Sequence, residues 1–254
     1  MTSSLTPTSV LDAIAERALN SDSAATPAIS DADAVAEAPA VVQAPAGAGF
    51  VALGLSPEIV SALMAAGYTA PTPVQERAIP AGIAGRDLLV SSPTGSGKTA
   101  AFMLPAIERF AQLQKTQAAQ PREANGERRA RKGPPVALPS LLVLTPTREL
   151  AMQVTTAAAT YGKHLRRLRT VSILGGVAYG LLLMLLAKNP EILVATPGRL
   201  LDHLQRGRID LSQLQILVLD EADRMLDMGF IEDIETIVAA TPASRQTMLF
   251  SATI

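Results

Sequence analysis

The sequence has 254 residues, of which 48% are hydrophobic and 18% charged, and its formal net charge is −1. A chain of this length forms one large domain or two small ones, and it buries a core without disulfide bonds. It contains no cysteine, which excludes disulfide bonds, thiolate metal sites and a cysteine nucleophile. The charge is uneven, because residues 1–49 carry −5 and the remainder carries +4. This mildly basic body keeps nucleic acid possible as a partner.

Residues 1–49 are rich in Ala, Ser, Thr, Pro and Asp. They bury too little apolar surface to offset the entropy of ordering, so we predict a disordered acidic tail with at most a short helix near residues 10–19. The start lacks the basic patch and apolar run of a secretory signal. The most apolar stretch, residues 171–187, is shorter than the ~20 residues of a membrane-spanning helix. We therefore expect a cytoplasmic protein without a membrane segment.

From Phe50 onward the sequence predicts helices that alternate with short strands. Ser56-Pro57 and Thr72-Pro73 are typical helix starts, and Gly67 ends the first of these two helices. Apolar runs predict strands over residues 87–91, 141–145, 170–174, 192–195, 216–220 and 247–250. Helical periodicity predicts helices over residues 98–113, 147–161, 177–187, 197–205 and 229–240. This order predicts the α/β fold class, a doubly wound parallel sheet sandwiched by helices, with ligands at the carboxyl ends of the strands.

The connection over residues 114–140 is unusually long for a compact α/β domain. It contains four prolines, and its cations outnumber its acids: Lys115, Arg122, Arg128, Arg129, Arg131 and Lys132 against Glu123 and Glu127. Loops of this length are either functional or disordered. Two interpretations stay open, a solvated flexible insertion and a basic flap that weakly attracts phosphate backbones.

A glycine-rich loop follows the first predicted strand and opens a helix. Its glycines let backbone N–H groups curl around an anion, and the helix N-terminus adds partial positive charge. Lys98 is expected to reach the β- and γ-phosphates, and the Thr99 hydroxyl to ligate Mg²⁺. Pro93 has no N–H, so the cradle begins at Thr94, and Ser92 stands where the strict motif has Gly. The predicted nucleotide-binding residues here are Ser92, Pro93, Thr94, Gly95, Ser96, Gly97, Lys98, Thr99 and Ala100.

Carboxylates follow the strand predicted over residues 216–220. In a doubly wound sheet they lie at the rim beside the phosphate loop. Asp220 is expected to hold Mg²⁺ with Thr99, largely through water. Glu221 is expected to orient or deprotonate the attacking water.

Asp220-Glu221-Ala222-Asp223 spells D-E-A-D, and residues 50–254 resemble the first RecA-like domain of DEAD-box RNA helicases, most closely the bacterial RhlE-type subgroup. The resemblance implies a RecA-like P-loop NTPase domain with ATP and Mg²⁺ as cofactors. Ser251-Ala252-Thr253 matches the motif that in this family touches the acidic motif and couples hydrolysis to strand separation. The implied catalytic residues are Lys98, Asp220, Glu221, Asp223, Ser251 and Thr253.

Residues 67–75 resemble the Q motif of the same family. The resemblance implies that Gln75 reads the adenine edge, that Phe50 stacks on the adenine ring, and that Tyr68 belongs to the nucleotide site. A structural alternative stays open for Gln75, because Thr72-x-x-Gln75 is also a capping box that satisfies a helix start.

Three further segments match motifs that grip the RNA sugar–phosphate backbone in this family. Each has a hydroxyl or Gly beside a helix start, which suits phosphate, although Thr-Pro pairs are also ordinary helix starts. The implied RNA-binding residues are Pro146, Thr147, Arg148, Gly175, Gly176, Thr196, Pro197, Gly198 and Arg199. Leu181-Leu182 departs from the family pattern, which often has Gln there.

The sequence is therefore identified as the N-terminal ATPase domain of a DEAD-box RNA helicase that couples ATP hydrolysis to local unwinding or remodelling of RNA duplexes. Relatives continue into a second RecA-like domain that supplies arginine fingers, so we expect this chain, as a monomer, to bind nucleotide but to hydrolyse it poorly. The alternatives are an ATP-gated RNA clamp or scaffold without productive unwinding, and a DNA translocase of the same superfamily.

For several remaining residues the sequence predicts a structural role rather than a place in a binding site. His164 and His203 are predicted at the surface, and Met225 and Met228 in packing. A basic run is predicted either to cap a helix end or to attract nucleic acid: Lys163, Arg166, Arg167 and Arg169.

Overall fold

A computed structural model of the protein describes residues 47–119 and 135–253. The predicted acidic tail up to residue 46, and residues 120–134 of the predicted insertion, lie outside the described residues. Within the described ranges, no helix is both long and apolar enough to cross a membrane.

Three helices precede the sheet: α2 (Ala48–Ala52), α3 (Pro57–Ala65) and α4 (Pro73–Ile83). The predicted starts of α3 and α4 are confirmed, each with Pro at the first helical position. The short helix α2 begins before the predicted end of the tail at residue 49. It is anchored by Phe50, which is fully buried.

The six predicted strands are confirmed to within one residue at each end. They are β1 (Leu88–Ser91), β2 (Leu141–Leu144), β3 (Thr170–Ile173), β4 (Ile192–Ala195), β5 (Ile216–Leu219) and β6 (Gln246–Ser251). They form one sheet in the order β1-β6-β5-β2-β4-β3, and all neighbouring pairs are parallel. Every residue of β2, β4 and β5 is buried, which explains their uninterrupted apolar sequences.

Helices connect the strands, as predicted for a doubly wound fold. They are α5 (Lys98–Ala119), α6 (Arg148–Tyr161), α7 (Tyr179–Leu186), α8 (Pro197–Gln205), α9 (Ala222–Asp227) and α10 (Ile231–Ala239). The prediction that α5 ends at residue 113 is wrong. Residues 114–119 contain good helix formers, and the first helix breaker is Pro121. At the far end of the predicted insertion, Ala137 is buried and forms a bridge to Ile209.

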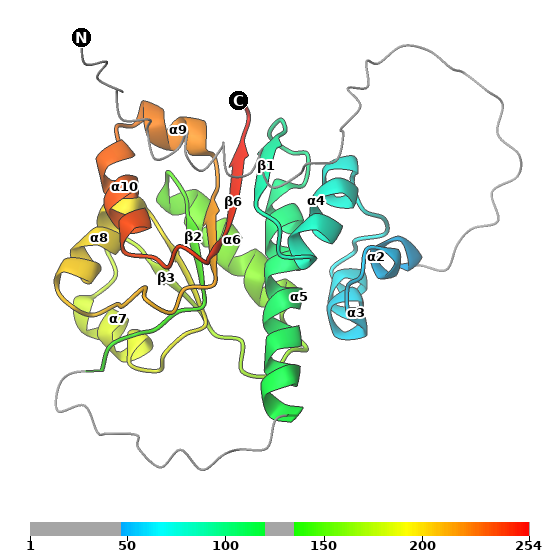
Figure 1. Ribbon diagram of the computed structural model, residues 1–254, viewed down its shortest axis with the longest axis horizontal. Coiled ribbons are helices and arrows are strands. Elements are labelled where there is room, and N and C mark those ends of the chain that lie inside the picture. The colour runs from blue at the N-terminus through cyan, green and yellow to red at the C-terminus, as the bar shows by residue number, and fades with distance from the viewer. Residues whose placement is uncertain (1–46, 120–134, 254) are drawn as a thin grey trace, which may run out of the picture.

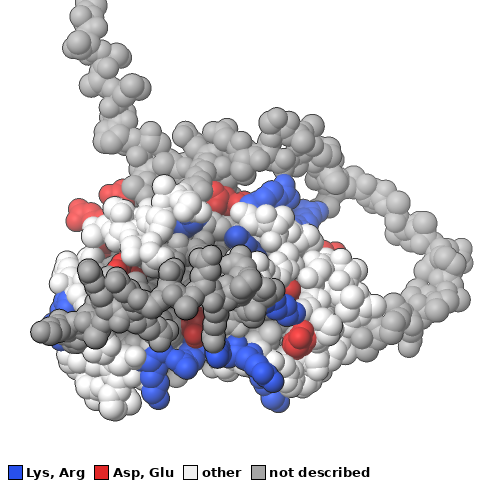
Figure 2. Space-filling view, turned by 60° about the horizontal axis from the view of Figure 1, so that its bottom comes forward, with Lys and Arg blue, Asp and Glu red and all other residues white. Residues whose placement is uncertain are grey.

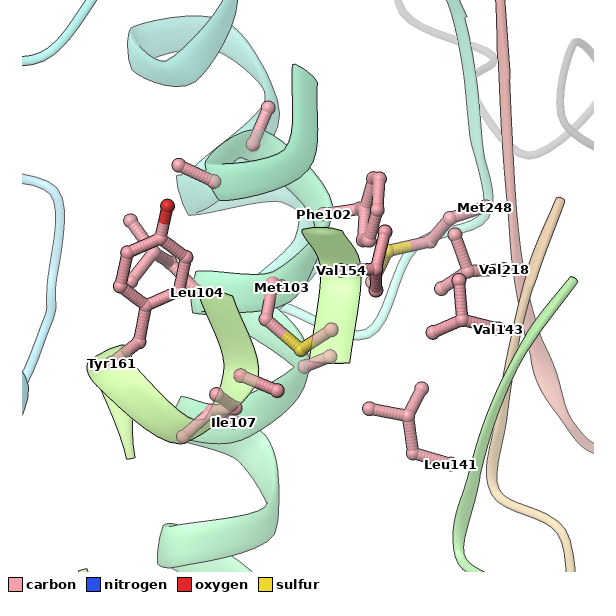
Figure 3. Packing of buried hydrophobic residues seen from close by; sticks show 14 of the residues in the cluster. Phe102, Met103, Leu104, Ile107, Leu141, Val143, Val154, Tyr161, Val218 and Met248 are labelled. Carbon is pink, nitrogen blue, oxygen red and sulfur yellow. The ribbon is translucent and has the colours of Figure 1, made fainter. Parts of the chain in front are cut away.

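Alternating strand residues supply the two hydrophobic cores on opposite faces of the sheet. Leu141, Val143 and Val218 belong to the core under α5 and α6, where Phe102 and Val154 meet them (Figure 3). Leu142, Leu144 and their neighbours point to the other face, under α7, α8 and α10. Figure 1 shows these two helical layers on either side of the strands.

Because all strands are parallel, their carboxyl ends share one edge of the sheet, which we call the carboxyl edge; the opposite one is the amino edge. The strand order sorts the predicted motifs along the carboxyl edge. The phosphate loop, the acidic motif and residues 251–253 follow β1, β5 and β6, which are neighbours. The three predicted RNA-binding segments follow β2, β4 and β3, which form the other half.

Candidate functional site

The loop between β1 and α5 curls tightly after a hydrogen-bonded exit from the sheet. The Ser92 backbone N–H donates to the Ser251 carbonyl of β6 at 3.0 Å. Gly95 and Gly97 have φ of 83° and 91°, a left-handed conformation that glycine adopts without steric cost. The hydroxyls of Ser92 and Ser96 lie 2.6 Å apart across the loop. The predicted phosphate loop therefore has the backbone conformation of an anion cradle.

Lys98 lies inside this cradle. Its side chain is buried, and Nζ donates to the Ser92 carbonyl oxygen at 2.7 Å. That oxygen takes the place that a phosphate oxygen would take as the acceptor for the ammonium group. Thr99 follows in the first turn of α5, and Ala100 is buried there. The structure thus gathers the predicted phosphate-binding residues into one loop and one helix start.

Gln75 joins the Q-motif segment to the phosphate loop. Its Oε1 accepts a hydrogen bond from the Thr72 N–H at 3.0 Å, as the capping-box interpretation predicts. Its Nε2 donates to the Gly97 carbonyl at 3.2 Å. Both polar atoms of the amide therefore have protein partners. Adenine recognition by Gln75 stays a prediction, and it requires that one of these two hydrogen bonds be replaced by a hydrogen bond to the base.

Two residues predicted for the nucleotide site have packing partners in the body of the domain. Phe50 has no exposed surface, because α2 buries it against α3 in the core, so its ring offers no face to an adenine. Tyr68 bonds through its hydroxyl to that of Tyr161 at 2.9 Å, and it lines a groove of about 580 Å³ on α6. The spacing of Phe50 and Tyr68 in the sequence did not predict that Phe50 packs against α3 or that Tyr68 contacts Tyr161.

Asp220 is the most buried acid of the candidate site, with 4% of its surface exposed. Burial raises its pKa to about 7, and repulsion by Glu221 adds to this, while attraction by Lys98 opposes it. An ionised carboxylate here is therefore costly without a cation. With the Thr99 hydroxyl it offers the hard oxygen ligands that Mg²⁺ prefers. Within the described ranges, no group of three or more His, Asp or Glu side chains could hold a metal ion.

Glu221 occupies an unusual backbone conformation at the start of α9. Its φ of 52° and ψ of 53° are left-handed, which is uncommon for a residue other than glycine. Its carboxylate pairs with Arg224 at 3.3 Å. The sequence analysis missed Arg224, although its i,i+3 spacing from Glu221 is a recognisable signal for such a pair.

Asp223 connects the acidic motif to the end of β6. Its Oδ2 accepts hydrogen bonds from the Thr253 hydroxyl at 3.0 Å and from the Ala252 and Thr253 N–H groups at 3.2 Å. Burial opposes ionisation, but these bonds and the one that the Arg224 backbone N–H donates to Oδ1 outweigh it and lower the pKa of Asp223. Ser251 donates to the Thr253 carbonyl at 2.6 Å. The predicted contact between the two motifs is thus present.

Two arginines converge on the glycine pair after β3. Arg148 Nη1 donates to the Gly175 carbonyl at 2.7 Å. A Cβ on Gly176 would lie 3.0 Å from Arg148 Nη1, and one on Gly175 would lie 3.3 Å from Arg199 Nη2. Three segments that are far apart in sequence therefore form one cationic surface at the carboxyl edge.

The residues around these arginines also serve as helix starts, as the alternative interpretation holds. Thr147 caps α6 by accepting the Leu150 N–H at 3.3 Å. Thr196 and Pro197 open α8, Pro146 and Pro197 are buried, and Gly198 is exposed. The helix-start role does not exclude phosphate binding, because exposed N–H groups at a helix start suit an anion.

Two structural predictions from the sequence are wrong. His203 is buried rather than at the surface, with its ring stacked on that of Tyr179 at a centroid distance of 5.6 Å. Burial lowers its pKa, and the neighbouring Asp202 opposes this shift. Met225 is buried as predicted, but Met228 is 49% exposed and contributes little packing.

Comparisons with known proteins identify the family of this chain. Residues 72–254 match the DEAD/DEAH box helicase family. The chain is 48% identical to the ATP-dependent RNA helicase DeaD of Escherichia coli strain K12 over 204 residues, which are 80% of this chain and 29% of DeaD. It is 42% identical to the DEAD-box ATP-dependent RNA helicase RhpA of Helicobacter pylori strain B128, covering 79% of this chain and 36% of RhpA.

A solved structure gives the same fold. The crystal structure of a DEAD box protein from the hyperthermophile Methanococcus jannaschii superposes with a TM-score of 0.67 at 36% identity, covering 81% of this chain and 50% of that one. The chain thus spans less than a third of DeaD and half of the archaeal protein. The family prediction is confirmed, while the RhlE-type subgroup stays a prediction. The protein described here belongs to the DEAD/DEAH box helicase family.

Proposed function

We propose that this chain is the ATP- and RNA-binding domain of an ATP-dependent RNA helicase. The observation that supports it best is the division of the carboxyl edge. Lys98 and Asp220 lie in the half formed by β1, β6 and β5, and Arg148 and Arg199 converge in the half formed by β2, β4 and β3. Two anionic ligands could therefore bind side by side on one sheet.

In the nucleotide half, the loop over residues 92–97 would hold the phosphates through its N–H groups. Lys98 would exchange the Ser92 carbonyl for a phosphate oxygen, and Thr99 and Asp220 would hold Mg²⁺. The bound cation would neutralise charge on the phosphates. Glu221 would orient the attacking water and accept its proton. Asp223 and Thr253 would transmit the state of this half to β6.

In the RNA half, Arg148 and Arg199 would bind phosphates without reading bases, because backbone contacts carry no sequence information. The binding partner is therefore RNA of any sequence. The proposal includes a second RecA-like domain in the full-length protein, which would close over the ATP and the strand. It also takes the protein to be a monomer in the cytoplasm.

We further propose that this chain alone binds nucleotide and hydrolyses it slowly. Loss of an arginine finger costs about 10³–10⁵ in turnover in related phosphoryl transfer. None of the residues described around Asp220 and Glu221 takes that role, since Arg224 already pairs with Glu221. Robust RNA-stimulated turnover by residues 1–254 would contradict this part.

The nucleotide site is tested by calorimetry with ADP and a non-hydrolysable ATP analogue in the presence of Mg²⁺. Lys98→Ala removes a charged hydrogen-bond donor worth about 1.5–3 kcal/mol, so the affinity should fall by about 10- to 150-fold. Lys115→Ala, at an exposed position on α5, is the matched control and should bind as the wild type does. Equal binding by both variants would refute the proposed site.

The activity is tested on a longer protein that includes the second domain. ATP turnover should be stimulated by RNA and less by DNA of matched length, and a short RNA duplex should separate. If the longer protein retains RNA in the presence of ATP but neither hydrolyses ATP nor separates the duplex, the clamp interpretation is favoured. Equal stimulation by DNA would favour the translocase.

A further inference from the structure

The amino edge of the sheet carries a group of exposed cations that the proposed function does not use. They lie in the two connections that lead from α6 to β3 and from α7 to β4. Arg169 Nη1 donates to the Lys188 carbonyl, which holds these two connections side by side. We call these five side chains the amino-edge cluster: Lys163, Arg166, Arg167, Arg169 and Lys188.

The charges of this cluster are not neutralised within the described ranges. None of the five side chains forms an ion pair there with a carboxylate. The acid beside them is Glu191, whose Oε2 accepts the Arg169 backbone N–H at 2.8 Å. Exposed like charges held close together repel one another, so a bound polyanion would lower their electrostatic energy.

A polar hollow adjoins the cluster. Its volume is about 440 Å³, and Arg167, Ser140, Asn189 and Gln215 contribute to its lining. Glu191 also lines it, and its carboxylate accepts the Arg169 backbone N–H. The loop that carries Asn189 is held by a hydrogen bond from the Leu138 N–H to Asn189 Oδ1 at 2.7 Å. Guanidinium, hydroxyl and amide groups are the donors that proteins use for phosphate oxygens. The hollow thus places further donors next to the cations.

The cluster lies on the opposite edge of the sheet from the acidic motif. The nucleotide half of the carboxyl edge holds Asp220, Glu221 and Asp223, and its other half holds Arg148 and Arg199, whereas the amino edge holds the cluster. In Figure 2, where the bottom of Figure 1 comes forward, Lys and Arg side chains gather along the lower part of the visible face. Residues 162–170 and 187–191 contain none of the large hydrophobic side chains that are exposed in the described chain; Met184 on α7 is exposed and precedes Lys188 by four residues. A membrane-binding surface would need several such side chains among its cations.

We propose that the amino-edge cluster is a second, sequence-independent binding surface for the phosphodiester backbone of RNA. This inference rests on the proposed RNA-binding function, and it adds a contact on the opposite edge of the sheet from Arg148 and Arg199. The surface would hold RNA that flanks the remodelled strand, and it would do so with or without nucleotide. A tether of this kind raises the effective concentration of RNA at the carboxyl edge.

The test measures binding of a fluorescent single-stranded RNA to residues 1–254 without nucleotide, over a series of salt concentrations. Each phosphate contact contributes about −0.7 to the slope of log affinity against log salt for single strands. The variant R166Q/R167Q/K188Q should therefore bind more weakly, with a slope shallower by up to about 2. R166K/R167K keeps the charges and should retain wild-type binding. The single variant R77Q, which removes one exposed arginine on α4, is the control for the single variant R166Q and should have the smaller effect.

Further measurements distinguish RNA from other anionic ligands, and they distinguish a failure of this inference from a failure of the proposed function. The triple variant should lose affinity for matched DNA to the same extent, because the phosphates are shared. Unchanged RNA binding by the triple variant, with loss only in R148A/R199A, would overturn this inference and leave the proposed function intact. The inference would also be overturned if the wild type floats with anionic vesicles and the triple variant does not, while both bind RNA equally well. A chain with no RNA affinity in any variant would instead refute the proposed function.

Discussion

Asp220 is a buried carboxylate whose ionisation lowers the stability of the ligand-free protein. Its pKa in the folded protein is about 7, against an ordinary value of 3.8, chiefly because burial disfavours the charged form. Between these two pH values the folded state binds more protons than the unfolded state does. The free energy of unfolding therefore falls as pH rises from about 4 to about 7.

Asp220→Asn is expected to remove this penalty. The ligand-free variant should be more stable than the wild type at pH 8, by up to about 4 kcal/mol, and the difference should shrink towards pH 4. Thermal unfolding in the presence of a chelator measures it. Asp227→Asn, at an exposed acid of α9, is the control and should change stability by less than about 0.5 kcal/mol. An Asp220→Asn protein that is less stable than the wild type at pH 8 would contradict the argument.

Gly97 is required for a reason beyond its backbone conformation. Gly95 and Gly97 both have positive φ, so an alanine at either position pays a left-handed penalty of about 1–2 kcal/mol. A Cβ on Gly97 would also lie 2.5 Å from Gln75 Nε2 and 3.1 Å from Thr72 Oγ1, whereas a Cβ on Gly95 meets nothing within 4 Å.

Gly97→Ala should therefore destabilise the ligand-free protein by about 1–3 kcal/mol more than Gly95→Ala does. Chemical denaturation of the two variants gives the comparison. In a Gln75→Ala background the closest of these contacts disappears and only the one with Thr72 Oγ1 remains, so the difference between the two glycine variants should shrink. If it does not, the Gln75 contact is not its cause.

The α4–α5 contact links the Q-motif segment to the phosphate loop at the scale of whole elements. The two helices approach closely at Gly82, where a Cβ would lie 2.7 Å from Pro105 Cβ. Because Gln75 lies in the first turn of α4 and Lys98 begins α5, this packing sets the distance between them. A change at Gly82 would therefore act on the site indirectly.

Two helical glycines are expected to respond to alanine with opposite signs. Gly82→Ala should lower the free energy of unfolding by about 1–3 kcal/mol, because the buried contact with Pro105 has no room. Gly180→Ala in α7 meets nothing within 4 Å and should raise it by about 0.5–1 kcal/mol, because alanine costs less chain entropy in a helix. Urea denaturation checks both. A neutral Gly82→Ala variant would show that the two helices can move apart freely.

At the scale of the whole molecule, one sheet carries the two proposed ligand surfaces along a single edge. β5 and β2 are neighbours at the boundary, and the Asp220 N–H donates to the Leu144 carbonyl at 2.9 Å. The nucleotide half and the RNA half thus meet through the central strands, which are buried on both faces. Strands of this kind open only with global unfolding.

Hydrogen–deuterium exchange is expected to separate the two halves. ADP with Mg²⁺ should slow exchange in residues 92–99 and 220–223 and leave residues 174–176 and 196–199 unchanged, because those segments follow strands of the other half. Single-stranded RNA should give the reverse pattern. Protection of both halves by ADP alone would show that the domain couples its ligands without a second domain.

The sequence by itself determined the strands, most helices and the chemistry of the motifs, because those signals are local. Uninterrupted apolar runs predict β2, β4 and β5. The glycines at positions 95 and 97 predict the left-handed backbone conformation of the loop that leads to Lys98. The signal for the end of α5 is also local: after residue 113, the first helix-breaking residue in the sequence is Pro121. α9 was missed, because a helix of six residues is too short to show a clear period.

Only the tertiary structure decided which of these segments meet. The strand order places β6 between β1 and β5, and packing buries Phe50 and His203, which sequence reasoning had placed at a ligand and at the surface. The bond from Gln75 to Gly97 and the convergence of Arg148 and Arg199 on one glycine pair join segments far apart in the chain. Such contacts arise from the folding of the sheet and its helices as one body, so no local pattern predicts them.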